Sequence, residues 1–347
     1  MCPPFISHTH ARRTFDRAFR TLPPSLHSRI WTRYLLWAET KSGNTIVSVY
    51  RRYLSVDPSV TERYTSLLLA PTNPCPRPLE AAKLLLRLAR QAARGEYTSP
   101  DSKSPYQLLG EWLDVVENFA EETGIDAEEA DRNHAKDKTE GNEEDAAANG
   151  ASQIPAPING GLIRFAGPPV PLSQDGAQSR PYDEDEDPTS MKKLDIEKLV
   201  HKDGLEVYKD QAGRLWTGLA TYWIKRGEFE RAKDTFEAGL SSVLTIRDFT
   251  QIFDAYAEFS ESLISALMES LANPEDEEED ATETEKELDG MMKSFEELMD
   301  RRPFLVNDVL LRRNPNDIQE WEKRVALWGD DDEKVYINVY LAVVQNN

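Results

Sequence analysis

The stretch LWTGLATYWIKRGEFERAKDTFEAGL, residues 215–240, predicts two short helices joined by a tight turn. In its first half, apolar residues recur at spacings of three, four and seven, the period of one face of an α-helix. These residues are Trp216, Leu219, Ala220 and Trp223. Gly227 follows, and glycine readily adopts the left-handed conformation that ends many helices. The apolar positions of the second half are Phe229, Ala232, Phe236 and Leu240. Because such a pair leaves an apolar face open, we expect it to stack on neighbouring pairs.

The order of large and small residues in this stretch, W-x2-L-A-x2-W and then A-x3-F, is the spacing of a tetratricopeptide-type (TPR) helix pair. Internal repetition near the start of the chain is a second signal of this type. Four residues there have a counterpart 35 positions later, a period typical of helix-pair repeats. The matched pairs are Phe15 and Tyr50, Arg17 and Arg52, Phe19 and Leu54, and Pro23 and Pro58. We therefore predict an all-α superhelical solenoid of antiparallel helix pairs.

Large aromatic residues recur at helical spacing, among leucine, valine and alanine, along the whole chain. They could act as platforms for stacked bases, but this spacing favours packing between helices of the repeats. The predicted packing residues are Trp31, Tyr34, Tyr50, Trp112, Trp216, Leu219, Trp223, Ala232, Phe236, Trp321 and Trp328.

Composition divides the chain into four segments. Residues 1–10 are expected to form an irregular leader, and residues 11–123 a first group of helix pairs. In residues 124–191, Asp, Glu, Asn, Ala, Gly and Pro dominate, so we predict a disordered acidic insertion with too little apolar surface to offset its ordering entropy. Helical periodicity resumes over residues 192–347, with a short acidic loop near residues 273–285. This last group is expected to break off inside a further repeat.

Capping residues predict where two of the helices begin. Ser104 precedes Pro105 and is followed three positions later by Gln107, which is the arrangement of a capping box. Asp248 is the predicted N-cap of a helix that begins at Phe249.

Charge is distributed unevenly along the chain. The net charge is -21, yet residues 1–100 hold 15 Lys and Arg against 6 Asp and Glu. The candidate docking residues in this basic region are Arg13, Arg17, Arg20, Arg33 and Arg52. Such a row could steer an acidic protein segment, or it could bind a phosphate backbone in a salt-dependent way. Alternatively, the arginines could form ion pairs within the chain, with Asp16, Glu39 and Glu62.

Several classes of function find no support in the sequence. The only cysteines, Cys2 and Cys75, form no disulfide framework, and no apolar run approaches the roughly 18 residues of a membrane span. His8 and His10 lack a recognisable third and fourth metal ligand, and no GxxxxGK[ST] phosphate loop occurs. We predict no enzyme activity, cofactor, metal site, small-molecule substrate or membrane partner.

Particular residues also resemble a known repeat class. The aromatic helix with Trp31, Tyr34 and Glu39 resembles the first helix of a half-a-TPR (HAT) repeat, a type found in RNA-processing scaffolds. The pattern resembling the second helix is Ala11, Phe15, Arg17, Ala18 and Pro23. Longer stretches, residues 12–54, 203–240 and 301–327, resemble the Syf splicing-factor family and its larger crooked-neck-like branch.

This resemblance implies a HAT/TPR-like solenoid that serves as a non-catalytic scaffold in the nucleus, as a subunit of the spliceosome-associated NineTeen complex. The implied partners are other splicing-complex proteins, namely crooked-neck-like and NineTeen complex subunits, with RNA contacted indirectly if at all. Family members are much longer, so the chain is expected to be a fragment. Two alternatives stay open: a nucleic-acid-binding module that uses the basic N-terminal repeats, or a link between transcription and DNA repair, which the animal relatives imply.

Overall fold

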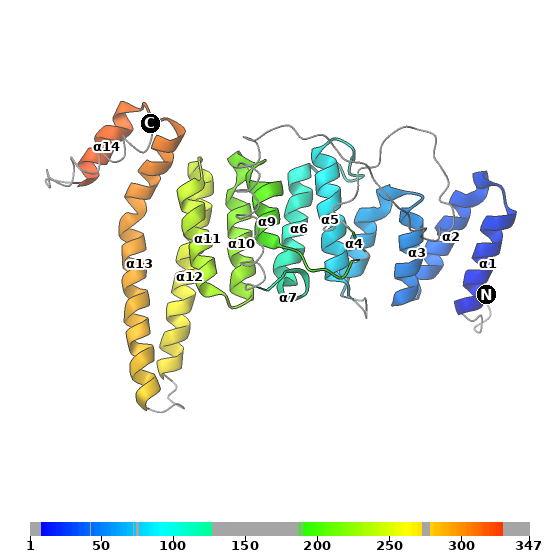
Figure 1. Cartoon of the computed structure of the whole chain (residues 1–347), viewed down its shortest axis with the longest axis horizontal. Helices are drawn as coiled ribbons and strands as arrows, with labels where there is room; N and C mark the ends of the chain where they lie inside the picture. Colours follow the sequence, from blue (N-terminus) through cyan, green and yellow to red (C-terminus); the bar gives the residue numbers. More distant parts are fainter. Residues whose placement is uncertain are drawn as a thin grey trace, which may run out of the picture.

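The computed structural model describes residues 8–41, 43–71, 73, 76–126, 187–188, 190–272 and 278–328. These residues form a row of helices from α1 at one end to α13 and α14 at the other (Figure 1). The first group is α1 (His8–Thr21), α2 (His27–Glu39), α3 (Asn44–Leu54), α4 (Thr61–Leu69), α5 (Pro78–Ala93), α6 (Pro105–Asn118) and α7 (Ala120–Thr123). The second group is α9 (Ile196–Leu199), α10 (Gly213–Lys225), α11 (Phe229–Ser242), α12 (Ile246–Ala272), α13 (Glu278–Arg313) and α14 (Ile318–Trp328). Short helical turns connect them, at Pro24–Leu26 (η1), Pro58–Val60 (η2), Val200–Leu205 (η4) and Lys209–Gln211 (η5).

The helices stack in pairs along the row. Neighbours in sequence pack together, as α2 does with α3, α4 with α5, α10 with α11, and α12 with α13. Contacts also cross between pairs, because α10 touches both α6 and α12. Each pair thus buries on the next pair the apolar face that it cannot cover alone. Within the described ranges, β-type pairing is limited to one bridge between Gly124 and Leu194. The predicted all-α solenoid is confirmed.

The central helix pair has the predicted form. Gly227 has a φ of 78°, in the left-handed region, and it ends α10 before α11 begins. Trp216 is only 6% exposed and lies against Gly239 of α11, where an added Cβ would come within 3.1 Å of the indole Cγ. The large indole on α10 therefore packs against α11 at a glycine, which has no side chain. Phe229 differs from the prediction, because it is 42% exposed and contacts Phe259 at the edge of the pair.

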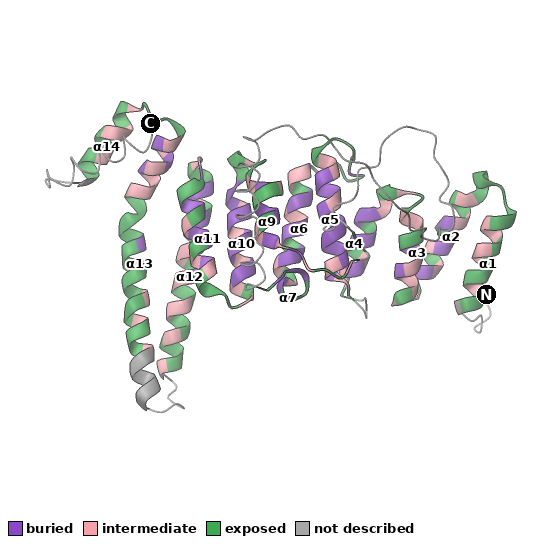
Figure 2. Cartoon of the chain, viewed as in Figure 1, coloured by how far each residue is buried: buried purple, intermediate pink, exposed green. Residues whose placement is uncertain are grey.

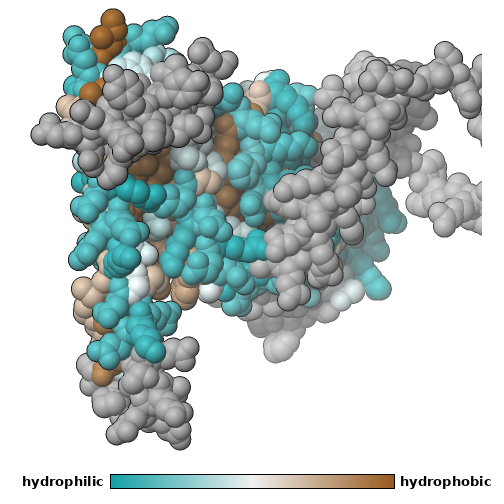
Figure 3. Space-filling model, turned by 60° about the vertical axis from the view of Figure 1, so that its left-hand side comes forward, coloured by the Kyte–Doolittle hydropathy of each residue, from teal (hydrophilic) through white to brown (hydrophobic). Residues whose placement is uncertain are grey.

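The hydrophobic interior extends along the solenoid instead of forming a single compact centre. One large cluster of buried residues runs from α5 to α13, and two smaller clusters join α1 to α3 and α3 to α5. Buried residues are concentrated on the middle helices, whereas α1 and the lower ends of α12 and α13 are mostly exposed (Figure 2). The long α12 and α13 project beyond the other helices (Figure 1), and the visible face of this projection mixes hydrophilic residues with apolar ones (Figure 3).

Segment boundaries differ in part from those expected. Helix α1 begins at His8, so the last three residues of the expected leader are helical. Most of the predicted acidic insertion lies outside the described residues, but its two ends are held together. The Ile125 N–H donates to the Leu194 carbonyl (2.9 Å), and the Leu194 N–H donates to the Thr123 carbonyl (2.8 Å). The described residues on the two sides of that segment are therefore neighbours in the structure.

The acidic loop was expected near residues 273–285, but its part from Glu278 onward is helical, because α13 begins there. The prediction relied on acidic composition, but glutamate is a good helix former and acidic residues stabilise the first turn of a helix. Residues 273–277 lie outside the described part of the chain, as does the expected final helix beyond Trp328.

One of the two predicted caps is confirmed and the other is wrong. Ser104 and Gln107 form the complete capping box of α6. At α12 the cap is Thr245, three residues before the expected one. The Thr245 hydroxyl accepts the Asp248 N–H (3.1 Å) and donates to its carboxylate (2.7 Å). Asp248 is therefore the third residue of the helix, where its carboxylate bonds back to the cap.

Candidate functional site

The arginines of α1 form an exposed basic face. Phe15 stacks on Tyr34 of α2 with ring centroids 4.3 Å apart, and Phe19 lies 4.4 Å from Trp31. These contacts turn one side of α1 towards α2. The arginines at helical spacing on the opposite side are Arg13, Arg17 and Arg20, and all three are exposed. We call these three residues the α1 arginine face.

The two remaining candidate arginines have different environments. Arg33 is exposed on α2. Arg52 of α3 instead forms an ion pair with Asp16 of α1, and its guanidinium lies 5.5 Å from the Phe19 ring centroid and 5.6 Å from that of Trp31. Arg52 therefore helps to hold α1, α2 and α3 together, and its guanidinium is less available to a partner than those of the other candidates.

Among the five candidate arginines, Arg52 is the one that forms an ion pair with another described residue. None of Arg13, Arg17, Arg20 and Arg33 forms an ion pair with any residue that the structure describes. The other two acidic residues proposed as partners of these arginines form ion pairs with other cations: Glu39 pairs with Arg63, and Glu62 pairs with Lys103. The α1 arginine face is thus free to contact another molecule.

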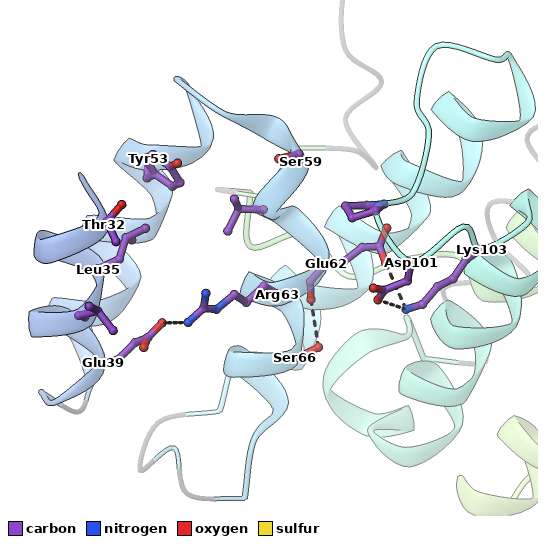
Figure 4. A pocket seen from close by; sticks show the side chains of 13 residues that line it. Thr32, Leu35, Glu39, Tyr53, Ser59, Glu62, Arg63, Ser66, Asp101 and Lys103 are labelled. Carbon is purple, nitrogen blue, oxygen red and sulfur yellow. Dashed lines mark hydrogen bonds and ion pairs between the residues drawn. The ribbon is translucent and has the colours of Figure 1, made fainter. Parts of the chain in front are cut away.

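A groove of about 510 Å³ opens between α2 and the loop that precedes α6 (Figure 4). Helix α2 forms one side, α4 and the turn before it lie in the middle, and residues 100–103 form the other side. The lining residues are Thr32, Leu35, Leu36, Glu39, Tyr53, Ser59, Val60, Glu62, Arg63, Ser66, Pro100, Asp101 and Lys103. We call this feature the α2–α4 groove.

One ion pair spans the groove from α2 to α4. Arg63 Nη2 lies 2.6 Å from Glu39 Oε1, and the same oxygen accepts the hydroxyl of Tyr50 at 2.5 Å. Tyr50 is fully buried, and its pKa is raised, first by burial and then by the hydrogen bond to Glu39. Tyr50 therefore stays protonated and helps to hold Glu39 in position.

A second charged cluster lies at the other side of the groove. Lys103 Nζ is 3.1 Å from Glu62 Oε2 and 2.7 Å from Glu111 Oε1, and the Tyr97 hydroxyl donates to Glu62 Oε1 at 2.8 Å. Burial acts to raise the pKa of Glu62, but hydrogen bonds from Ser99, Tyr97 and Lys103 outweigh it and lower that pKa overall. Glu62 is 8% exposed and charged, so it fixes α4 to the loop before α6.

Helical periodicity does not predict this groove. Its lining residues come from three separate stretches that only the stacking of the repeats brings together. One local signal was present in Leu36, an apolar residue that lies off the buried stripe of α2 and is 53% exposed.

Most of the predicted packing residues are buried. Those with exposures of 6% or less are Trp31, Tyr34, Tyr50, Trp112, Trp216, Leu219, Trp223, Ala232 and Phe236. Trp321 is half-buried, and its Nε1–H donates to the Pro315 carbonyl at 2.8 Å. The side chain of Trp328 lies outside the described residues.

The described part of the chain contains no cluster of His, Cys, Asp and Glu side chains that could hold a metal ion. The side chain of His8 lies outside that part. Among the described helices, none combines the length and the apolar character that crossing a membrane requires.

Comparison with known proteins gives matches to two family models. The model described as the pre-mRNA-splicing factor SYF1 middle HAT repeat matches residues 183–346. The model described as the pre-mRNA-splicing factor Syf1/CNRKL1 N-terminal HAT repeat matches residues 5–59. Together they cover more than half of the chain, one before the predicted insertion and the other from its last residues onward.

Individual relatives match nearly the whole chain. The pre-mRNA-splicing factor SYF1 of Mycosarcoma maydis is 49% identical over 378 residues, which is 99% of this chain and 34% of the relative. The syf1 protein of Neurospora crassa is 38% identical over 97% of this chain and 32% of its own length. The human SYF1 protein is 35% identical over 97% of this chain and 30% of its own length. The chain spans about a third of the length of these curated relatives.

Proposed function

Because the chain belongs to the Syf1 family of HAT-repeat pre-mRNA-splicing factors, we propose that it acts in splicing as a non-catalytic scaffold in the nucleus. In this proposal it is part of a subunit of the spliceosome-associated NineTeen complex, and its helical-repeat surface docks other proteins of that complex. A solenoid suits this role, since it presents a long surface relative to its core.

The observation that carries the docking proposal is the α1 arginine face. Arg13, Arg17 and Arg20 are exposed and have no ion-pair partner among the described residues, while the chain as a whole has a net charge of -21. A local basic surface on an acidic protein attracts an acidic segment of a partner and speeds its association. Arginine suits such a surface because its guanidinium can bond a carboxylate through two N–H groups.

The environment of the aromatic rings on α1 favours a protein partner over single-stranded RNA. Recognition of single strands usually places bases on exposed aromatic rings. On α1, however, Phe15 and Phe19 are occupied by ring contacts with Tyr34 and Trp31. Among the described residues of α1, no Phe, Tyr or Trp ring is therefore left free beside the arginines to hold a base.

A charge reversal tests this proposal. The variant Arg13→Glu with Arg17→Glu should lose most capture of splicing-complex proteins from nuclease-treated nuclear extract, measured by mass spectrometry. The matched control is Arg94→Glu with Arg247→Glu, which changes the net charge equally at two exposed arginines elsewhere. Equal capture by the two variants would refute docking at the α1 arginine face. Capture that disappears on nuclease treatment of the unaltered chain would favour the nucleic-acid-binding alternative.

A further inference from the structure

We propose that the α2–α4 groove binds an amphipathic α-helix of another protein, with apolar side chains over Leu36 and Val60 and a basic side chain beside Asp101. This inference goes beyond the proposed function, because it concerns a different surface with the opposite charge preference. It stands whether or not the α1 arginine face docks a partner.

Leu36 is the most exposed of the large apolar residues that line the groove. Its side chain is 53% exposed on a helix whose buried residues are Trp31, Tyr34 and Ala38, so it contributes little to the core beneath α2. Leu35 and Val60 are half-buried and line the same groove. Covering these side chains would remove apolar surface from water, which is favourable by about 25 cal/mol per Å².

The hydroxyl groups of the groove offer little to a small polar ligand, because they bond within the chain. Thr32 donates to the Ser28 carbonyl (2.9 Å), Ser59 donates to the Asp57 carboxylate (2.6 Å), and Ser66 donates to the Glu62 carbonyl (3.0 Å). What the groove still offers is apolar contact and charge. Both are what the side chains of an amphipathic polypeptide supply.

Asp101 sets the charge that the partner must carry. Its side chain is 72% exposed and lies 4.0 Å from Lys103, whose ammonium group is closer to Glu62 and Glu111. Asp101 is therefore the carboxylate of the groove that the chain neutralises least. Carboxylates also outnumber cations in the lining, three to two, so a basic peptide is favoured and a phosphate backbone is repelled.

The walls indicate a helical partner. The groove is lined mainly by α2 and α4, whose backbone N–H and C=O groups are largely used within their own helices, so an added strand would find no open edge there. A helix can instead lay side chains spaced three, four and seven residues apart between two neighbouring helices. Leu36 on one side of the groove and Val60 in its middle would receive two successive apolar positions of that helix.

The experiment uses a phage-displayed library of random 16-residue peptides, selected on the full chain. We expect enriched peptides to carry apolar residues at helical spacing together with Lys or Arg. Binding of the synthesised peptides would then be measured by fluorescence polarisation, and their helicity by circular dichroism. Leu36→Glu should weaken binding about tenfold or more, since it replaces apolar contact with a charge. Asp101→Lys should weaken it roughly two- to fivefold, as expected for an exposed ion pair.

Two further variants control for added charge and for folding. Met299→Glu, at an apolar residue 41% exposed on α13, should bind the peptides as the unaltered chain does. Leu36→Ala removes the apolar contact but keeps a good helix former in α2, so the helix should stay folded. Weaker binding by this variant would therefore come from the lost contact and not from unfolding. Enriched peptides that bind Leu36→Glu as tightly as the unaltered chain would overturn the proposal. So would enrichment of acidic or non-helical peptides, or a dimer of the chain that Leu36→Glu dissociates.

Discussion

Arg90 donates hydrogen bonds from Nε and Nη2 to one carboxylate oxygen of Asp203, which lies 113 residues further along the chain. The two donor–acceptor distances are 3.0 and 2.6 Å, and both side chains are largely buried. This pair joins α5 to the helical turn η4, across the predicted insertion. Together with the bridge between Gly124 and Leu194, it joins the two groups of helices through contacts between described residues.

We therefore predict that residues 127–186 are dispensable for folding. Replacing them with a short Gly/Ser linker should leave the melting temperature within a few degrees, because each doubling of loop length costs only about 0.6 kcal/mol. Calorimetry would check this. A fall of more than about 10 °C would mean that the segment packs on the solenoid. As a positive control, Arg90→Met leaves the Asp203 carboxylate without its partner and should cost roughly 3–5 kcal/mol.

Trp216→Ala should be among the most damaging substitutions in the chain. The indole is buried between α10 and α11, and its ring meets that of His201 edge-on with centroids 5.3 Å apart. Loss of a large buried aromatic side chain costs roughly 3–5 kcal/mol, which urea unfolding monitored by circular dichroism would measure. Met292→Ala, at a side chain 39% exposed on α13, is the control and should be nearly neutral. Similar losses from the two variants would contradict the packing role assigned to Trp216.

Substitution by alanine should destabilise the protein at Gly227 and stabilise it at Gly110. Gly227 has a φ of 78° and open space around the position of a Cβ, so Gly227→Ala meets only backbone strain, about 1–2 kcal/mol. Gly110 lies within α6, also with open space, so Gly110→Ala should stabilise by roughly 0.5–1 kcal/mol. Denaturant midpoints of the two variants would show this. If the midpoints of both variants shift in the same direction, backbone conformation does not explain the effect at one of the two glycines.

Local features of the sequence were sufficient to predict the helix pairs. The spacing of Trp216, Leu219 and Trp223, the glycine at 227, and the Ser104–Gln107 capping box all act within one or two turns of chain. Their effects on structure therefore depend little on the rest of the fold. The acidic start of α13 was missed because composition alone does not distinguish a solvated loop from a solvated helix.

The candidate site was less predictable, since it depends on distant neighbours. Arg17 and Arg52 are equivalent in the 35-residue repeat, so periodicity placed them in one basic row. Only the packing of α3 on α1 reveals that Asp16 binds Arg52 while Arg17 stays free. The α2–α4 groove forms where three separate stretches of the chain stack, and helical periodicity does not specify how they stack.

The last prediction concerns pH and uses Glu62, whose buried carboxylate joins α4 to the loop before α6. Its folded-state pKa lies below the ordinary value of 4.5: burial opposes ionisation, but hydrogen bonds from Ser99, Tyr97 and Lys103 favour it more strongly. The stability contributed by ionised Glu62 is thus fully present above about pH 4.5 and is lost as pH falls through the lower folded-state value. The variant Glu62→Gln should accordingly melt several degrees below the unaltered chain at pH 7, and the gap should narrow as the pH is lowered below 4.5.

Comparing the two proteins at each pH removes the effect of the many other carboxylates, which titrate in both. Glu96→Gln is the matched control, because Glu96 is exposed and has no ion-pair partner among the described residues, so its gap should be near zero throughout. Melting curves from pH 3 to pH 7 supply the measurement. A Glu62→Gln gap that stays constant down to pH 3 would show that shape and packing, not charge, account for the effect. The cluster of Glu62, Tyr97 and Lys103 would then have no electrostatic part in holding that side of the α2–α4 groove.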